Sequence, residues 1–370
     1  MDYRPDIDGL RAVAVVPVVL FHAGIPGFSG GYIGVDVFFV ISGFLITSII
    51  AREIAQGRFS LVSFYERRAR RILPALLVMM AATLAAGHML LLPDELSELG
   101  RQTLATTCFV SNVHFAMIFG YFGPAAEFAP LLHTWSLAVE EQFYLFFPPL
   151  LAFLAARIGL KGASGVVAGL SVLSLILAVV LLSEAPSWTF YMIVTRAWEL
   201  GAGALLALVA IAPPRRLWRD LVGVAALAAI FLPVVLYTST TPFPGLAALP
   251  PVLGATALIW IGRAGSDSVA TRLLSLAPMV WIGLISYSLY LWHWPVLAFC
   301  HYWYGAFPPL GPRVFAVLVS FVLGWASWKF IETPMRKERP WTEGRRAFAS
   351  AAAATLVLLG SGLAIVAAKG

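Results

Sequence analysis

The sequence predicts an all-α polytopic membrane protein, a bundle of ten transmembrane helices with an eleventh helix at the C-terminus. Composition supports this fold class, because 60% of the residues are hydrophobic and only 12% are charged, a balance not typical of soluble globular domains. Apolar runs of spanning length recur along the whole chain. Positive charge concentrates in the short segments between them, as the positive-inside rule expects, so the net charge of +6 does not indicate nucleic-acid binding.

Ten apolar runs define the predicted bundle, and an eleventh follows them. They cover residues 10–26, 32–51, 73–92, 134–155, 165–183, 190–210, 221–237, 247–261, 278–300, 313–331 and 347–367. Asp2, Asp6 and Asp8 precede the first run and no small-residue cleavage site ends it, so we expect this run to remain as a helix. Cys108 and Cys300 have apolar surroundings and no metal-ligand spacing, so we expect two small core residues and no metal site.

The charged segments between the runs set the predicted orientation. The arginine-rich segment 52–71 should be cytoplasmic, and the acidic segment 94–98 should lie outside. Residues 101–120 are only moderately apolar and include Asn112 and His114. If they spanned the membrane, every later basic loop would fall on the wrong side, so we expect a re-entrant or interfacial segment there. The N-terminus is then cytoplasmic and the C-terminus outside.

The first two runs carry ionisable residues. His22 follows Arg11 by eleven residues, which returns to nearly the same helical face about 16 Å further along. An ionisable group inside hydrocarbon is costly and is usually functional. A structural alternative is that Arg11 extends to the membrane edge while His22 bonds to a neighbouring helix. Asp36 enters the second helix from the side of His22, where it could orient the imidazole or merely cap its own helix.

A later run carries a second group of polar residues. His133, Glu140 and Tyr144 share one helical stripe, whereas Glu141 points about 100° away from it. Two adjacent buried carboxylates need partners. Because a histidine and a carboxylate are the usual acid–base partners, the glutamates are candidates to work with His22.

Two further runs place ionisable groups towards the outer half of the membrane. Arg196 and Glu199 are three residues apart and predict an ion pair. The segment Ser286–Pro295 brings His293 to the same level. A polar network that only holds the bundle together is the alternative to a functional site, and the pair of Arg196 with Glu199 fits that alternative best.

The inner membrane edge carries a cluster of arginines. Arg67, Arg68 and Arg71 belong to Phe64–Pro74, just before an apolar run. The positive-inside bias alone would explain their charge. A guanidinium fork nevertheless favours phosphate, so these residues, beside Arg11, would also suit a phosphorylated cytosolic ligand.

Six features of the sequence together carry a family resemblance. They are the pair Arg11 and His22 and the segments Gly31–Ile46, Phe64–Pro74, Leu132–Tyr144, Ser286–Pro295 and Glu332–Arg336. With them the chain resembles the acyltransferase-3 family of membrane O-acyltransferases from Tyr3 to about Arg336. The resemblance implies a cytosolic acyl-CoA donor, most often acetyl-CoA, and a hydroxyl acceptor on the outer side, such as a glycan of the lipopolysaccharide O-antigen.

The resemblance also assigns site residues. It marks Arg11 and His22 as essential and the Glu140–Glu141 pair as part of the site. We expect His22 to act as general base or as acyl carrier, with the two glutamates and Asp36 orienting or tuning it. The residues expected to bind substrate are Arg67, Arg68, Arg71, His133, Ser136, Tyr144, Arg196, Tyr290 and His293.

The expected domain organisation follows from the extent of the resemblance. Residues 1–340 are expected to form the membrane acyltransferase domain, and residues 341–370 an extra transmembrane helix. In some family members such a helix leads to an extracytoplasmic SGNH-type domain, which is therefore a candidate partner alongside membrane lipid, the glycan acceptor and acyl-CoA. The expected location is the bacterial inner membrane.

Two other functions remain open at this stage. A transporter or flippase of a lipid-linked sugar could use the same ionisable residues to relay protons. A membrane anchor for an outer domain would need none of them.

Overall fold

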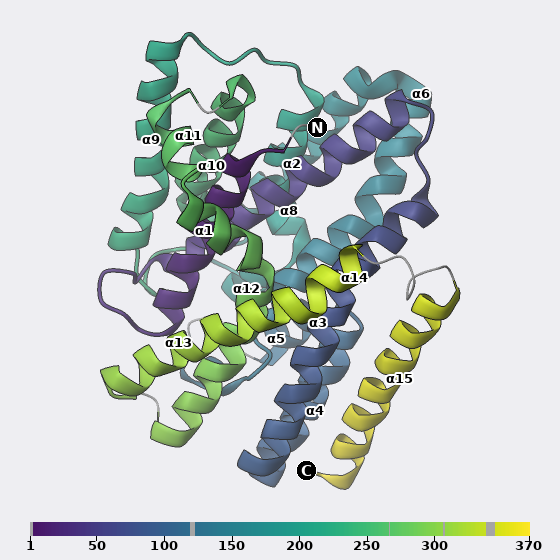
Figure 1. Ribbon diagram of the computed structural model, residues 1–370, viewed down its shortest axis with the longest axis vertical. Helices are drawn as coiled ribbons and strands as arrows, with labels where there is room; N and C mark the ends of the chain where they lie inside the picture. Colours follow the sequence, from purple (N-terminus) through teal and green to yellow (C-terminus); the bar gives the residue numbers. More distant parts are fainter. Residues whose placement is uncertain (1–2, 119–122, 266, 306–307, 338–344) are drawn as a thin grey trace. The chain divides into compact units, whose positions relative to one another are not determined.

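The computed structural model describes residues 3–118, 123–265, 267–305, 308–337 and 345–370, and this part of the chain forms helices and no strand (Figure 1). Among the described residues, seven helices are long and apolar enough to cross a membrane. Each of the eleven predicted apolar runs coincides with helical segments. The prediction of an all-helical polytopic membrane protein is confirmed, while ten spans followed by an eleventh remain a prediction.

The chain forms two compact units. Unit 1 consists of Met1–Phe59 and Val139–Ser286, and unit 2 consists of Ser60–Ala138 and Tyr287–Gly370. Two long helices, α6 (Thr134–Val180) and α12 (Ala277–Tyr304), contribute residues to both units.

Unit 1 holds the N-terminal helices and the middle of the chain. Besides parts of α6 and α12, its elements are α1 (Pro5–His22), η1 (Gly31–Ile33), α2 (Gly34–Ala55), α7 (Pro186–Tyr191), α8 (Ile193–Leu208), α9 (Arg216–Leu236), η3 (Gly245–Ala248), α10 (Leu249–Ile261), η4 (Gly262–Ala264) and α11 (Val269–Leu274). Within this unit α2 packs along α8 and also contacts α1 and α10. The helix α2 is therefore the central element of unit 1.

The packing of α2 against α8 depends on glycines that let the two backbones approach. A Cβ on Gly43 of α2 would lie 1.9 Å from the carbonyl oxygen of Leu200, and one on Gly203 of α8 would lie 2.0 Å from that of Val40. Small residues at helix contacts are the usual route to close packing within membranes, where the hydrophobic effect between helices is absent. The pair Gly43 and Gly203 therefore fixes the separation of α2 and α8.

A glycine also divides α6. Gly159 has φ 71° and ψ 167°, so the helix breaks there into two limbs. Residues 134–155 and 165–183 were predicted as separate spans with Arg157 and Lys161 between them, and the break lies between these two basic residues. Only a residue without a Cβ adopts this positive φ without strain.

Unit 2 holds the remaining helices. Besides parts of α6 and α12, its elements are α3 (Leu61–Leu90), α4 (Pro93–Thr107), α5 (Ser111–Ile118), η2 (Pro124–Phe128), α13 (Leu310–Ser327), the π-helical turn η5 (Trp328–Glu332), α14 (Thr333–Lys337) and α15 (Arg345–Ala368). The helix α15 packs along α4 and also contacts α3 (Figure 1). The C-terminal apolar run is thus a helix associated with unit 2.

The segment 101–120 has a break in its backbone. The helix α4 ends at Thr107, Phe109 adopts φ 53°, and α5 begins at Ser111. A hydrogen bond of 2.8 Å joins His114 of α5 to Glu98 of α4. Burial raises the pKa of Glu98. Its hydrogen bonds with His114, Arg101 and Gln102, and the nearby charge of His114, lower the pKa by more, so the pKa of Glu98 lies below its usual value. The re-entrant course of this segment remains a prediction.

Two expectations from the sequence are wrong. The acidic segment 94–98 is not a loop but the first turns of α4, because Glu95 accepts a hydrogen bond from the amide of Leu92 and caps the helix. Cys108 is exposed at the end of this helix, and Cys300 is half-buried, so neither is a fully buried core residue.

The close approach of α2 and α8 yields a stability prediction. Gly203→Ala adds a Cβ that meets the backbone of Val40 at 2.0 Å, so the helices must separate, at a cost of about 1–3 kcal/mol. We expect a lower melting temperature of the purified protein in detergent. Gly169→Ala on α6 is the matched control, because no heavy atom lies within 4 Å of its added Cβ. Equal melting temperatures for the two variants would contradict this account.

Candidate active site

His22 lies at the end of a helix. It is the last residue of α1, is half-buried, and its ring lies 5.1 Å from that of Phe21. The prediction that the helix continues four residues beyond His22 is wrong. Gly24 adopts φ 62°, which ends the helix, and Pro26 follows. The imidazole therefore lies at a helix terminus rather than within a helix.

Arg11 lies on the same uninterrupted helix. It is half-buried, and its Nη1 lies 3.5 Å from the Oδ1 of Asp8, one turn earlier. Because α1 includes both positions, the predicted helical relation between Arg11 and His22 is confirmed. Their separation along the helix is about 16 Å.

A fully buried cluster of three charged groups joins α2 to α8. The Nη2 of Arg196 lies 3.2 Å from the Oδ1 of Asp36 and 3.3 Å from the Oε2 of Glu199. The predicted pair of Arg196 with Glu199 is confirmed. For Asp36, two roles were predicted, orienting His22 or capping α2. The structure shows an ion pair between this carboxylate and Arg196, and the two roles remain predictions.

Aromatic rings enclose this cluster. The Cζ of Arg196 lies 5.5–5.6 Å from the ring centroids of Phe39, Phe190 and Phe243. Three ring faces near one desolvated guanidinium add cation–π stabilisation. Arg196 is therefore built into the interior of unit 1, and its predicted contact with substrate remains untested.

The glutamate pair of α6, Glu140 and Glu141, includes a residue that is hydrogen-bonded to α2. Ser42 donates a hydrogen bond of 2.6 Å to the Oε1 of Glu140. Glu140 and Glu141 are half-buried, and Tyr144, one turn further, is buried. Sequence reasoning did not select Ser42 as a site residue, although it lies within the segment Gly31–Ile46 that carries the family resemblance. The structure thus supplies the hydroxyl that holds Glu140.

Unit 2 brings four of the predicted substrate-binding residues together. The hydroxyls of Ser136 and Tyr290 lie 2.6 Å apart, and Tyr290 also donates to the carbonyl of His133 at 3.0 Å. The ring of His293 lies 5.7 Å from that of His133 and 5.3 Å from that of Tyr290. Neither ring nitrogen of the buried His133 has a hydrogen-bond partner among the described residues. The cluster brings hydroxyl and imidazole groups together within unit 2.

The predicted arginine cluster lies in the first turns of α3. Ser60 accepts a hydrogen bond from the amide of Ser63 and starts this helix. Arg67 is exposed, and Arg68 and Arg71 are half-buried. All three lie in unit 2. The helix therefore presents several guanidinium groups close together.

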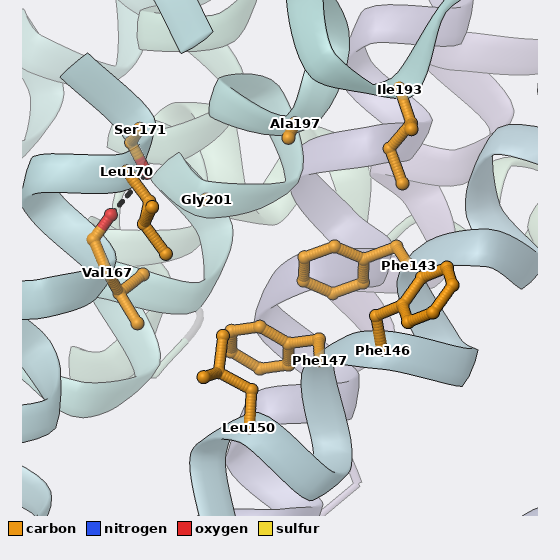
Figure 2. A pocket seen from close by; sticks show the side chains of 10 residues that line it. All are labelled: Phe143, Phe146, Phe147, Leu150, Val167, Leu170, Ser171, Ile193, Ala197 and Gly201. Carbon is orange, nitrogen blue, oxygen red and sulfur yellow. Dashed lines mark hydrogen bonds between the residues drawn. The ribbon is translucent and has the colours of Figure 1, made fainter. Parts of the chain in front are cut away.

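An apolar pocket of about 160 Å³ lies within unit 1 (Figure 2). Both limbs of α6 and the helix α8 line it, and Phe143 and Phe147 stack beside it with ring centroids 4.4 Å apart. Ser171, its polar side chain, donates to the carbonyl of Val167 at 2.8 Å. No acid–base side chain lines this pocket, so its lining fits an apolar group better than a catalytic site.

A metal centre has no support in the described part of the chain. Its histidine, cysteine, aspartate and glutamate side chains form no group of three that could hold a metal ion.

Several known proteins are similar in sequence to this chain. A family model described as "Acyltransferase domain" matches residues 4–329. "O-acetyltransferase OatA" of Staphylococcus aureus is 32% identical over 362 residues, which cover 94% of this chain and 58% of that protein. "Putative O-acetyltransferase SAS0844" of the same organism is 34% identical over 359 residues, covering 91% and 58%. The chain therefore spans less than two thirds of the length of these relatives. No solved structure matches it.

The buried cluster yields a second stability prediction. Arg196→Met would leave the carboxylates of Asp36 and Glu199 without a cation, which should destabilise the protein by about 3–5 kcal/mol. Glu199→Gln should cost much less, because one cation and one carboxylate remain paired. Melting temperatures in detergent measure the difference, and a larger loss for Glu199→Gln would contradict the assignment of Arg196 as the central charge.

Proposed function

The chain belongs to the acyltransferase family whose domain matches residues 4–329, and we propose that it transfers an acetyl group from acetyl-CoA to a hydroxyl of an extracytoplasmic glycan. The family expected from the sequence is thereby confirmed. Support for acetyl transfer comes from relatives that carry the name O-acetyltransferase. The lipopolysaccharide O-antigen is the acceptor that we propose, and the bacterial inner membrane is the location.

The single observation that carries the mechanism is the placement of His22 at the end of α1. The acceptor hydroxyl oxygen attacks the thioester carbonyl, so a C–O bond forms and the C–S bond breaks. As general base, the imidazole takes the hydroxyl proton and passes it to the departing thiolate. As acyl carrier, an imidazole nitrogen attacks the thioester carbonyl, so a C–N bond forms, the C–S bond breaks and CoA leaves as the thiolate. The hydroxyl oxygen then attacks the acetyl carbonyl, the C–N bond breaks, and the hydroxyl proton passes to the freed imidazole or to the thiolate.

The remaining polar residues of unit 1 have supporting roles in this proposal. Glu140, held by Ser42 at 2.6 Å, and Glu141 tune or orient the imidazole. Arg11 is the second essential residue of α1. Asp36 acts through the ion pair that fixes α2 against α8.

The donor and the substrate contacts are assigned to unit 2. Its arginines Arg67, Arg68 and Arg71 would hold the phosphate groups of CoA, since the guanidinium fork matches phosphate oxygens. The cluster of His133, Ser136, Tyr290 and His293 would contact uncharged polar groups of a substrate. An orientation with the N-terminus in the cytoplasm and the C-terminus in the periplasm places the arginine segment on the donor side.

The domain assignment is also part of the proposal. Residues 1–340 form the acyltransferase domain, and residues 341–370 contain a further transmembrane helix. An SGNH-type domain is the proposed partner that helps to pass the acetyl group to the glycan.

The test is turnover of acetyl-CoA labelled in its acetyl group by the solubilised protein, with a glycan acceptor. His22→Ala should lower turnover by about 10²–10⁴-fold, the contribution typical of a general acid–base residue. His88→Ala is the matched control, because His88 also lies in the last turn of a helix and is exposed outside the proposed site. Label retained on the wild-type protein would identify the acyl-carrier route.

Two results would contradict the proposal. Equal turnover by wild type and His22→Ala would remove the histidine from the chemistry. Movement of a lipid-linked sugar across vesicles without any acyl donor, together with no turnover of acetyl-CoA, would support the transporter instead.

A further inference from the structure

The junction after α13 has an unusual backbone. The helix passes through the π-helical turn η5, in which the amide of Thr333 bonds to the carbonyl of Trp328, and continues as α14. Pro334 has no amide hydrogen, and its ring would crowd the carbonyl of Phe330 in a regular α-helix. Single π-helical turns are frequently found at functional sites, so the side chains that this turn presents are candidates for a role.

Glu332 ends the π-helical turn as a buried carboxylate. It is 1% exposed, and both of its oxygens have partners. Its Oε2 accepts a hydrogen bond of 3.0 Å from Ser288 of α12, and its Oε1 accepts one of 3.2 Å from the Nη1 of Arg336. Because a buried carboxylate is costly unless it is paired and hydrogen-bonded, this geometry is strongly defined.

The guanidinium of Arg336 is hydrogen-bonded to Glu332, while much of its side chain is exposed. Its side chain is 45% exposed although it is bonded to a carboxylate that is 1% exposed. A guanidinium has five N–H donors, and the bond to Glu332 uses a donor on Nη1. Lys329, on the same turn, points elsewhere, with its Nζ 4.9 Å from the ring of Trp325. Arg336 is therefore the cation that this turn orients.

The turn packs against the helix that carries the arginine cluster. Within unit 2, η5 and α14 contact α3 (Figure 1). Tyr287, beside Ser288, donates a hydrogen bond of 2.8 Å to the carbonyl of Ile72, the residue after Arg71. The hydrogen-bonded series of Ser288, Glu332 and Arg336 is therefore linked, through Tyr287, to α3 next to its arginines. Those arginines are Arg67, Arg68 and Arg71.

We infer that Arg336 is a further member of the phosphate-binding arginine cluster, and that Glu332, supported by Ser288, is the residue that positions it. The inference rests on the proposed function for its ligand, the phosphate groups of CoA. Anionic lipid headgroups share this phosphate chemistry and are the other source of such a ligand. A guanidinium fixed by a buried carboxylate loses less conformational freedom on binding phosphate than a free one.

The experiment measures equilibrium binding of CoA and of pantetheine, which lacks phosphate, to the purified chain in phosphatidylcholine nanodiscs. Arg336→Gln should bind CoA about tenfold more weakly, through loss of a charge-assisted bond, and pantetheine equally well. Glu332→Gln should weaken CoA binding in the wild-type background but have no further effect in Arg336→Gln, since it acts only through that residue.

Controls separate this effect from general damage. Lys329→Gln removes one positive charge from η5, the turn that precedes α14, and should leave CoA binding unchanged. Melting temperatures of all variants test folding, and Ser288→Ala replaces Glu332→Gln if that variant does not fold.

Each alternative outcome has a separate meaning. Tight CoA binding by wild type and by Arg336→Gln alike would overturn the inference and leave the proposed donor intact. No CoA binding by wild type would overturn both the inference and the donor. Loss of retained phosphatidylglycerol in Arg336→Gln, with CoA binding unchanged, would assign the site to lipid headgroups and overturn the inference.

Discussion

The buried guanidinium of Arg196 sets the strictest constraint on unit 1. Because Arg196 is fully buried, no bulk water reaches its guanidinium and its partners must come from the protein. Asp36 on α2 and Glu199 on α8 supply them at 3.2 and 3.3 Å. These distances require α2 and α8 to lie close together, which Gly43 and Gly203 permit. The ion pair and the glycine contacts therefore depend on each other.

The helix α2 also positions the side chains that we assign to catalysis. Asp36 and Ser42 are six residues apart on α2, so they point in directions about 120° apart. One contacts α8 and the other holds Glu140 of α6. The start of α2 also approaches α1, where a Cβ on Gly34 would lie 2.1 Å from the carbonyl of Ala14. The position of α1, and with it His22, follows from the packing of α2.

The sequence predicted what depends on local spacing. Apolar runs of spanning length located the helices, and the spacing within α8 predicted the pair of Arg196 with Glu199. The pairing of Asp36 with Arg196 joins residues 160 positions apart, so no local pattern contains it. The end of α1 could have been predicted, because Gly24 is a typical helix-ending residue, but the apolar run continues past it. Local spacing thus predicts which residues share one face of a helix. Tertiary packing determines which helix faces contact each other.

The burial of the partner carboxylate decides what an arginine can do in this protein. Arg196 and its partners are all buried, so its charge is paired within the protein. Arg70 pairs with Glu66, whose side chain is 30% exposed, so solvent weakens this interaction. Arg336 combines an exposed guanidinium with the buried carboxylate of Glu332. This combination gives the Arg336 guanidinium both a fixed orientation and access to solvent, two properties that favour phosphate recognition.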